Sequence, residues 1–292
     1  YDGMGGRFMP KRRWEELRRA GILVGVFFPP ILGWLNLRVN YRNHRKIVVI
    51  DGNVGFVGGF NIGREYISKD PGFGYWRDTH LRITGEAVMS LQIRFALDWN
   101  YATGENLFKN EAYFRTDLKK KTDGRRDKER PAWPDPELEG SQVGMQIIAS
   151  GPDTREPHIR NNYLELFHKA KHHIYIQTPY FVPDDAIFSA LKMAALSGVD
   201  VRLMIPCKPD HPFVYRATCS YAGELLDYGA KVYIYTNGFL HSKGIMVDGR
   251  VCCYGTANMD IRSFELNFEV NATIYDEAVT AELEQAFMND LP

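Results

Sequence analysis

The most constraining feature of this sequence is a motif that occurs twice. Both copies follow one formula: His, any residue, Lys, four residues, Asp, six residues, Gly, a small residue, any residue, Asn. They lie in the stretches NHRKIVVIDGNVGFVGGFN (43–61) and LHSKGIMVDGRVCCYGTAN (240–258). The matched residues are His44 with His241, Lys46 with Lys243, Asp51 with Asp248, Gly58 with Gly255, Gly59 with Thr256, and Asn61 with Asn258. Such self-similarity indicates two structural units of one kind in a single chain.

The motifs lie within a longer repeat of apolar strands and amphipathic helices. In the second copy, strand patterns alternate with helical patterns of about 10 to 15 residues. The strands are expected at 145–150, 173–181, 199–206, 231–237 and 266–276, and the helices at 158–171, 185–198, 220–230 and 277–290. In the first copy, a helix (12–21) and a strand (22–29) precede the motif, and a strand (78–85) and a helix (86–100) follow it. The pattern predicts an α/β fold with two pseudo-two-fold-related sandwich halves.

We place the halves at 1–114 and 141–292, with a linker or insertion at 115–140. The linker is rich in charge and proline and has no periodicity, which is typical of a solvated loop; contact with an anionic lipid surface is the alternative. The run from Met145 to Gly229 spans 85 residues, whereas the corresponding run from Tyr1 to Gly21 spans 21. The first half is therefore expected to be N-terminally truncated by about 60 residues and to contain fewer strands than the second.

Composition limits the function classes. The formal net charge is zero, which argues against a nucleic-acid binder, since such proteins usually carry a basic excess. The four cysteines form no C-x-x-C pair and no metal-ligand spacing, and we interpret them as reduced thiols. The apolar stretch 20–35 contains Pro29–Pro30 and is too short to span a bilayer. Its part from 26 to 34 is interpreted as core wall or as a loop that dips into a membrane.

The motif itself suggests phosphodiester chemistry. Strand alternation puts His and Lys on one face, and two copies supply two imidazoles, two ammonium groups and two carboxamides to one pocket. Lys46, Lys243, Asn61 and Asn258 would bind the non-bridging oxygens. One imidazole would attack phosphorus, and the other would protonate the leaving oxygen and later activate the acceptor. Neither a metal nor another cofactor is required.

Four acidic residues are candidates for supporting roles. Asp51-Gly52 and Asp248-Gly249 are typical of tight hairpin turns, so each Asp is either a turn residue or part of the catalytic set. Aligning DTHLRI with EVNATI pairs Asp78 with Glu269. We expect these two to orient the histidines, because a nucleophilic imidazole works best when a carboxylate holds its other nitrogen. Exposed strand acids are the alternative.

The sequence resembles the phospholipase D superfamily, whose H-x-K-x(4)-D signature it carries twice, and within it the bacterial cardiolipin synthases. The matching segments include YRNHRKIVVIDG, YWRDTHLRITGEAV, IQTPYFVPDD and GTANMDIRSFELNFEVNA. The resemblance implies that one phosphatidylglycerol transfers its phosphatidyl group to another and releases glycerol. It also implies amino-terminal membrane helices outside this chain, in a bacterial inner membrane with the catalytic part on the cytoplasmic side. The implied active site comprises His44, Lys46, Asp51, His241, Lys243 and Asp248, with His44 as nucleophile and His241 as general acid.

Two other functional interpretations stay open. A hydrolase of the same superfamily, either phospholipase D or nuclease, would share the pocket but use water as the acceptor. A binding module without activity would keep only the fold, and the two complete His-Lys-Asp sets count against it. Zero net charge and the apolar loop count against a nuclease. Only the resemblance separates transfer to a lipid alcohol from transfer to water.

Overall fold

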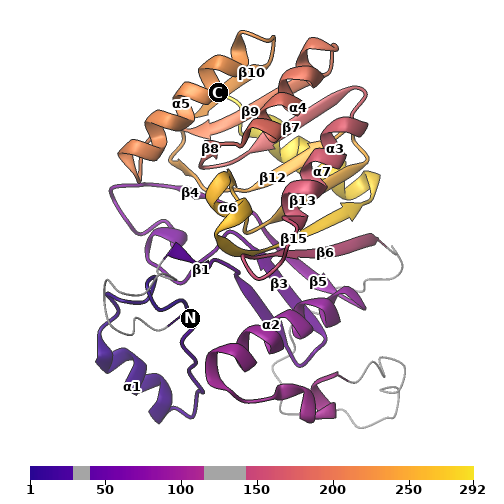
Figure 1. Cartoon of the computed structure of the whole chain (residues 1–292). Helices are drawn as coiled ribbons and strands as arrows, with labels where there is room; N and C mark the ends of the chain where they lie inside the picture. Colours follow the sequence, from indigo (N-terminus) through magenta and orange to yellow (C-terminus); the bar gives the residue numbers. More distant parts are fainter. Residues whose placement is uncertain (29–39, 115–142) are drawn as a thin grey trace.

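The computed structural model describes residues 1–28, 40–114 and 143–292 (Figure 1). It has an α/β architecture, as predicted from the sequence. A large sheet, built mainly by the second half, carries helices on both faces, and a smaller sheet from the first half packs beside it (Figure 1). Within the described ranges, no helix combines the length and the apolar character that crossing a bilayer requires.

The large sheet has eight strands. Their order is β1-β15-β13-β12-β7-β9-β10, and β6 also pairs with β15. The adjacent strands β7, β9 and β10 are parallel, whereas β12 is antiparallel to both of its neighbours. The bounds are β1 (Arg42–Asn43), β6 (Gly144–Ser150), β7 (His173–Gln177), β9 (Asp200–Pro206), β10 (Lys231–Tyr235), β12 (Gly244–Val247), β13 (Val251–Gly255) and β15 (Asn267–Tyr275).

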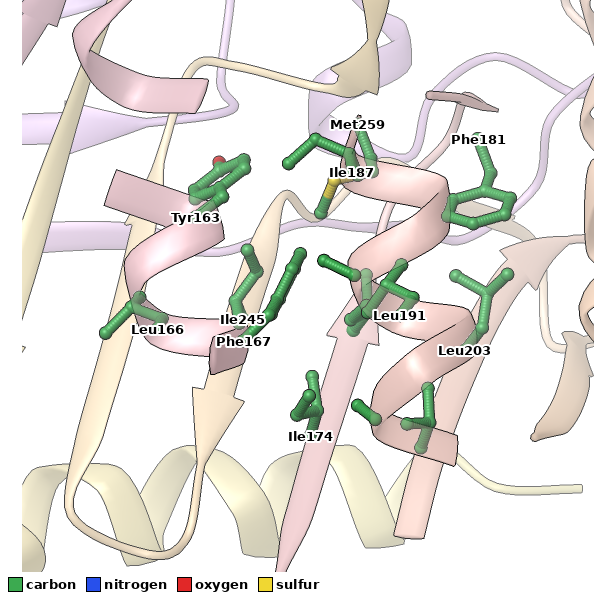
Figure 2. Packing of buried hydrophobic residues seen from close by; sticks show 14 of the residues in the cluster. Tyr163, Leu166, Phe167, Ile174, Phe181, Ile187, Leu191, Leu203, Ile245 and Met259 are labelled. Carbon is green, nitrogen blue, oxygen red and sulfur yellow. The ribbon is translucent and has the colours of Figure 1, made fainter. Parts of the chain in front are cut away.

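Helices cover both faces of this sheet because its strands are apolar on both sides. Helices α3 (His158–Lys169), α4 (Asp185–Leu196) and α5 (Pro212–Leu226) lie over one face, and α7 (Glu277–Asn289) lies over the other. Figure 2 shows Phe167 and Leu191, from α3 and α4, packed over Ile174 of β7. The next residue, Tyr175, points to the opposite face and stacks on Phe287 of α7, with ring centroids 5.1 Å apart. Each fully buried aliphatic side chain contributes about 1.5–3 kcal/mol.

The first half forms a three-stranded sheet in the order β2-β3-β5. The first half contains the helices α1 (Lys11–Arg19) and α2 (Ala87–Thr103), and the strands of its sheet are β2 (Ile47–Ile50), β3 (Val54–Gly58) and β5 (His80–Thr84). Val57 and Leu91 of this half belong to one buried cluster with Val270 and Ala272 of β15. The two halves therefore share a core, and neither sheet is buried independently of the other.

The halves differ in their strands. The described part of the chain has five strands before residue 114 and ten after residue 143, which agrees with the expectation of fewer strands in the first half. β12 is paired along both edges, by β13 and β7, whereas β2 pairs only with β3 among the described residues. The boundaries at 1–114, 115–140 and 141–292 stay predictions. The linker 115–140 and residues 29–34 of the 26–34 loop lie outside the described residues.

Two short parallel pairs hold the loops around the strand ends. β4 (Trp76–Arg77) pairs with β11 (Phe239–Leu240), and β8 (Phe181–Val182) pairs with β14 (Met259–Asp260), which leads into α6 (Ile261–Glu265). In the described part of the chain, 3₁₀ turns lie at Glu65–Ile67, Leu107–Lys109 and Glu111–Phe114. Because β4 belongs to the first half and β11 to the second, their pairing fixes one half against the other.

Local expectations failed at three places. The strand predicted over 22–29 is wrong within 22–28, where the chain makes only an isolated bridge between Asp2 and Phe27. The strand predicted over 173–181 ends at Gln177 and resumes as β8, because Pro179 lacks the N–H that a continuous ladder needs. Helix α5 begins at Pro212, earlier than predicted, with proline in the favoured first turn.

Candidate active site

The two motif histidines lie just before β2 and β12, and each is fixed by backbone contact with the other half. The His44 amide donates to the carbonyl of Phe268 at 3.0 Å, next to the β1–β15 pairing. The His241 amide donates to the carbonyl of Arg77 at 2.7 Å, next to the β4–β11 pairing. The same type of contact therefore occurs twice, in opposite directions, as expected for two related halves.

The side-chain contacts of the histidines also cross between the halves. Nδ1 of His44 lies 2.9 Å from both carboxylate oxygens of Glu269. Nδ1 of His241 lies 2.7 Å from Oδ2 of Asp78. Both carboxylates have fully buried side chains. With Nδ1 held as a donor to a carboxylate, Nε2 of each ring stays unprotonated in the neutral imidazole and is the nitrogen left for chemistry.

Each carboxylate is itself fixed by further hydrogen bonds. Glu269 accepts from Oγ1 of Thr256 at 2.5 Å and from Nδ2 of Asn267 at 3.0 Å. Burial raises the pKa of Glu269, but His44, Lys46 and Thr256 together hold it below its ordinary value. The sequence reasoning missed Asn267, although its position two residues before Glu269 on one strand placed both side chains on the same face.

Asp78 has a different set of partners. Its Oδ1 accepts from the backbone N–H of Thr79 at 2.8 Å. Burial raises its pKa, but Lys243 and His241 outweigh that effect and keep it below the ordinary value. Gly59, which takes the place of Thr256 in the first motif, leaves the room that Asp78 needs: a Cβ there would lie 2.0 Å from Oδ1 of Asp78.

The two lysines lie beside the histidines without a carboxylate partner. Nζ of Lys46 donates to the carbonyl of His44 at 2.7 Å, and Nζ of Lys243 to the carbonyl of His241 at 2.5 Å. No ion pair engages either lysine in the part of the chain that the structure describes. Burial lowers the pKa of Lys46 to about 7 and that of Lys243 to about 8. A bound anion would favour the charged form of both lysines.

Burial also disfavours charge on the imidazoles. It is the largest cause that lowers the pKa of His241 to about 3, and the nearby Lys243 ammonium adds to it. Burial likewise lowers the pKa of His44, where Glu269 opposes the effect. His44 is the more accessible of the two, with 27% of its side chain exposed against 9% for His241. Without an anion in the site, the neutral form of both rings is therefore favoured.

The two motif asparagines differ in environment. Asn61 is exposed, and its amide donates to the hydroxyl of Tyr66 at 2.6 Å. Tyr66 in turn meets His241 edge-on, with ring centroids 5.6 Å apart. Asn258 is buried, and its Oδ1 has no hydrogen-bond partner among the described residues. A buried amide oxygen without a partner costs about 1–3 kcal/mol, so a hydrogen-bond donor from a ligand would be favoured at this position.

Asp51 and Asp248 require a correction. Both occupy hairpin turns at the far ends of β2 and β12, with positive φ values of 53° and 56°. Each lies five positions after its motif lysine, which is about 16 Å of extended chain. The Asp248 carboxylate accepts the backbone N–H groups of Lys171, His172 and His173 at 2.7–2.8 Å. The expectation that these carboxylates share the pocket is wrong, and the turn interpretation holds.

Among the described residues, no group of three or more His, Cys, Asp or Glu side chains is arranged to hold a metal ion. The donors that converge on the histidines are ammonium, amide and hydroxyl groups, which suit the oxygens of a phosphodiester.

Comparisons with known proteins point in the same direction. Residues 163–291 match a family model described as "Cardiolipin synthase, PLD-like domain". The chain is 51% identical over 291 residues to "Major cardiolipin synthase ClsA" of Bacillus subtilis and 50% identical over 292 residues to "Cardiolipin synthase" of Listeria innocua. Both alignments cover 100% of this chain but 56% of the relative, so the chain spans little more than half the length of these relatives.

One solved structure resembles most of the fold. The phosphatidylserine synthase of Haemophilus influenzae aligns with a TM-score of 0.59 at 18% identity. The match covers 84% of this chain and 61% of that chain. This likeness supports the fold alone.

Proposed function

The chain belongs to the phospholipase D superfamily and is related to the bacterial cardiolipin synthases, and we propose that it carries the active site of a phosphatidyltransferase that makes cardiolipin. The donor and the acceptor are both phosphatidylglycerol, and the second product is glycerol. The reaction passes through a phosphatidyl group bound to histidine.

The observation that carries this proposal is the pair of crossed histidine–carboxylate contacts. His44 with Glu269 and His241 with Asp78 supply two imidazoles of fixed tautomer to one site. A double displacement at phosphorus needs one nitrogen to form the covalent bond and a second to move the proton. Two lysines without carboxylate partners provide the positive charge for the phosphate oxygens.

In the first step, Nε2 of His44 attacks phosphorus and the bond from phosphorus to the glycerol oxygen breaks. Nε2–H of His241 gives its proton to that oxygen, so free glycerol leaves. Glu269 stabilises the positive charge that develops on His44 through the hydrogen bond at Nδ1. The phosphatidyl group is now attached to His44, and His241 is neutral.

In the second step, a terminal hydroxyl of another phosphatidylglycerol gives its proton to Nε2 of His241. The hydroxyl oxygen bonds to phosphorus while the bond from phosphorus to His44 breaks. Cardiolipin leaves, His44 returns to its neutral state, and His241 regains the proton that it lost.

We assign attack to His44 because its side chain is the more open of the two. His241 must then be protonated when the substrate binds, although its pKa is lowered to about 3 in the free site, chiefly by burial. The phosphodiester carries the negative charge that compensates this effect, and it also favours the charged forms of Lys46 and Lys243. Substrate binding is therefore coupled to proton uptake.

The remaining assignments follow from the matched positions of the two repeats and from the contacts described above. Lys46, Lys243 and the two asparagines bind non-bridging oxygens, while Asp78 and Glu269 orient the imidazoles. The partners are phosphatidylglycerol and anionic membrane lipid rather than nucleic acid, and the site acts without a metal cofactor. We place it at the inner membrane of a bacterium, on the cytoplasmic side.

The test uses the intact protein and vesicles that contain phosphatidylglycerol labelled in the acyl chains. Cardiolipin and glycerol in equal amounts are the expected products. A phospholipase D-type hydrolase would give phosphatidic acid and glycerol instead, and that result would replace the transferase by the hydrolase.

A further inference from the structure

A carboxylate outside the motif lies at the same edge of the large sheet as the catalytic histidines. β7 ends at Gln177, directly opposite Gly244, which follows Lys243. The neighbouring parallel strand β9 ends at Pro206, and the loop after it contains Asp210. Because parallel strands end at the same edge, this loop lies on the side of the sheet where β12 begins.

Hydrogen bonds hold the two loops of this edge in place. The hydroxyl of Thr178 accepts from the amide of Met259, next to Asn258, and donates to the carbonyl of Tyr180. Sγ of Cys207 donates to the carbonyl of Gly238, three residues before His241. The side chains that the loops carry are therefore fixed relative to the second motif.

Tyr180 and Asp210 form a pair at this edge. The Tyr180 hydroxyl donates to Oδ2 of Asp210, and the amide of His211 donates to Oδ1 at 2.8 Å. Both side chains are half-buried, so the pair is fixed yet accessible. No basic side chain of the described residues forms an ion pair with Asp210.

The negative charge of Asp210 affects the pKa of two residues near His241. Burial dominates the lowered pKa of Lys243, and Asp210 is among the carboxylates that oppose it. Burial raises the pKa of Tyr66 to about 12, and the Asp210 charge adds to this rise. A fixed negative charge here repels the anionic phosphodiester, so the groups that gain from it are neutral and hydroxyl-bearing.

An unused donor lies beside His241. The indole of Trp76 is 5.0 Å from the His241 ring and 4.7 Å from the Tyr66 ring, measured between centroids. Trp76 is buried, and its Nε1–H has no hydrogen-bond partner in the described part of the chain. A buried donor without a partner costs free energy, which a ligand oxygen would recover.

From these contacts we propose that Asp210, held by Tyr180, and the indole N–H of Trp76 form a subsite for the hydroxyl groups of glycerol. A glycerol hydroxyl donates to the Asp210 carboxylate and accepts from Trp76, while another hydroxyl reacts at His241. The subsite makes the phosphatidyl group prefer a glycerol-type alcohol over water or a simple alcohol. This inference rests on the proposed phosphatidyl transfer and names the feature that selects its acceptor.

The test compares acceptors in the intact protein. Vesicles supply unlabelled phosphatidylglycerol, and isotopically labelled glycerol and 1-propanol are added at equal concentration, so that transfer to free glycerol is counted as labelled phosphatidylglycerol and transfer to propanol as labelled phosphatidylpropanol. The wild type is expected to prefer glycerol as the acceptor. Asp210→Asn should lower the ratio of glycerol product to propanol product by about tenfold or more, because hydrogen bonds to a charged acceptor are the strong ones.

Two further variants separate the subsite from a folding defect. Tyr180→Phe keeps the ring but frees Asp210, and should lower the same ratio less than Asp210→Asn does. Asp200→Asn removes a carboxylate from the opposite end of β9, where it pairs with Arg202 and Lys231, and should leave the ratio unchanged. Thermal midpoints of all variants should match the wild type within a few degrees.

The outcomes separate this inference from the proposed function. A wild type without preference for glycerol, or an Asp210→Asn variant with an unchanged ratio, overturns the subsite. A wild type that makes phosphatidic acid and no cardiolipin overturns the proposed transferase, and the ratio measured with free glycerol still decides whether the subsite exists.

Discussion

Oδ2 of Asp78 lies 2.7 Å from Nδ1 of His241, although the two residues belong to different halves of the chain. The reciprocal contact joins His44 of the first half to Glu269 of the second. Each imidazole is therefore oriented by a carboxylate from the opposite repeat. An isolated half would have a histidine without its carboxylate, so the catalytic apparatus requires both halves together.

Replacing either motif histidine should abolish turnover. His44→Ala removes the proposed nucleophile and His241→Ala the proton donor, so each is expected to lower kcat by at least about 10³-fold. Headgroup release from labelled phosphatidylglycerol measures this, with the exposed His172→Ala as the control of unchanged rate. Acid quenching should trap the phosphatidyl group on His44; an adduct on His241 would reverse the two roles.

The orienting carboxylates should matter nearly as much. Glu269→Gln and Asp78→Asn keep size and hydrogen-bonding capacity but permit the wrong imidazole tautomer and remove the charge that stabilises imidazolium. We expect kcat to fall by about 10²- to 10⁴-fold while KM changes little. Single-turnover experiments check this: the first variant should slow formation of the phosphohistidine more than the second. Rates near wild type would show that the contacts are structural only.

The buried lysines predict an unusual pH dependence of stability. Burial lowers the pKa of Lys46 to about 7 and of Lys243 to about 8, against about 10.5 in the unfolded chain. Between pH 8 and 10 the unfolded state therefore binds more protons, and the free energy of unfolding should rise with pH by up to about 1.4 kcal/mol per unit for each lysine. Chemical denaturation of wild type, Lys46→Met and Lys243→Met across this range measures the difference.

A bound anion should reverse that trend. Inorganic phosphate or tungstate favours the protonated lysines, so it should bind more tightly at pH 7 than at pH 9 and take up protons. Calorimetry in buffers of different ionisation enthalpy counts these protons. Uptake that persists unchanged in Lys46→Met and Lys243→Met would assign it to other groups.

Asp248 should contribute to stability and not to the chemical step. Asp248→Asn removes the charge from a carboxylate that binds three backbone N–H groups, and asparagine tolerates the positive φ of this turn. The free energy of unfolding should fall by about 1–3 kcal/mol, with kcat of the folded protein within about twofold of wild type. A large loss of kcat without loss of stability would return Asp248 to the catalytic set.

Activity should survive chelation. The proposed pocket neutralises the phosphate with ammonium groups and an imidazolium, so neither a divalent ion nor its bound water takes part. Exhaustive dialysis against EDTA should leave the rate within about twofold of the untreated protein. Loss of activity that one particular divalent metal restores would contradict the mechanism.

Local sequence patterns predicted much of the fold. The alternation of apolar residues located α3, α4 and α7 and most of the long strands, because period and burial are coupled within a single element. The Asp-Gly dipeptides predicted both hairpin turns. The irregular segment at 22–28 was not predicted, because it depends on contacts outside its own stretch. The break after Gln177 has a local cause in Pro179 that the prediction overlooked.

In the candidate site, too, some relationships were predictable from the sequence and others were decided by tertiary structure. The duplicated formula placed a histidine beside a lysine at the start of each motif strand, which is a local relationship that the sequence determines. Which carboxylate meets which imidazole was decided by tertiary structure: His44 and Glu269 are 225 positions apart, and His241 and Asp78 are 163 apart. Likewise, only the packing of the loop before β7 shows that Asp248 binds backbone amides. Such contacts depend on how two sheets pack against each other, and periodicity along one strand carries no information about its partner across the core.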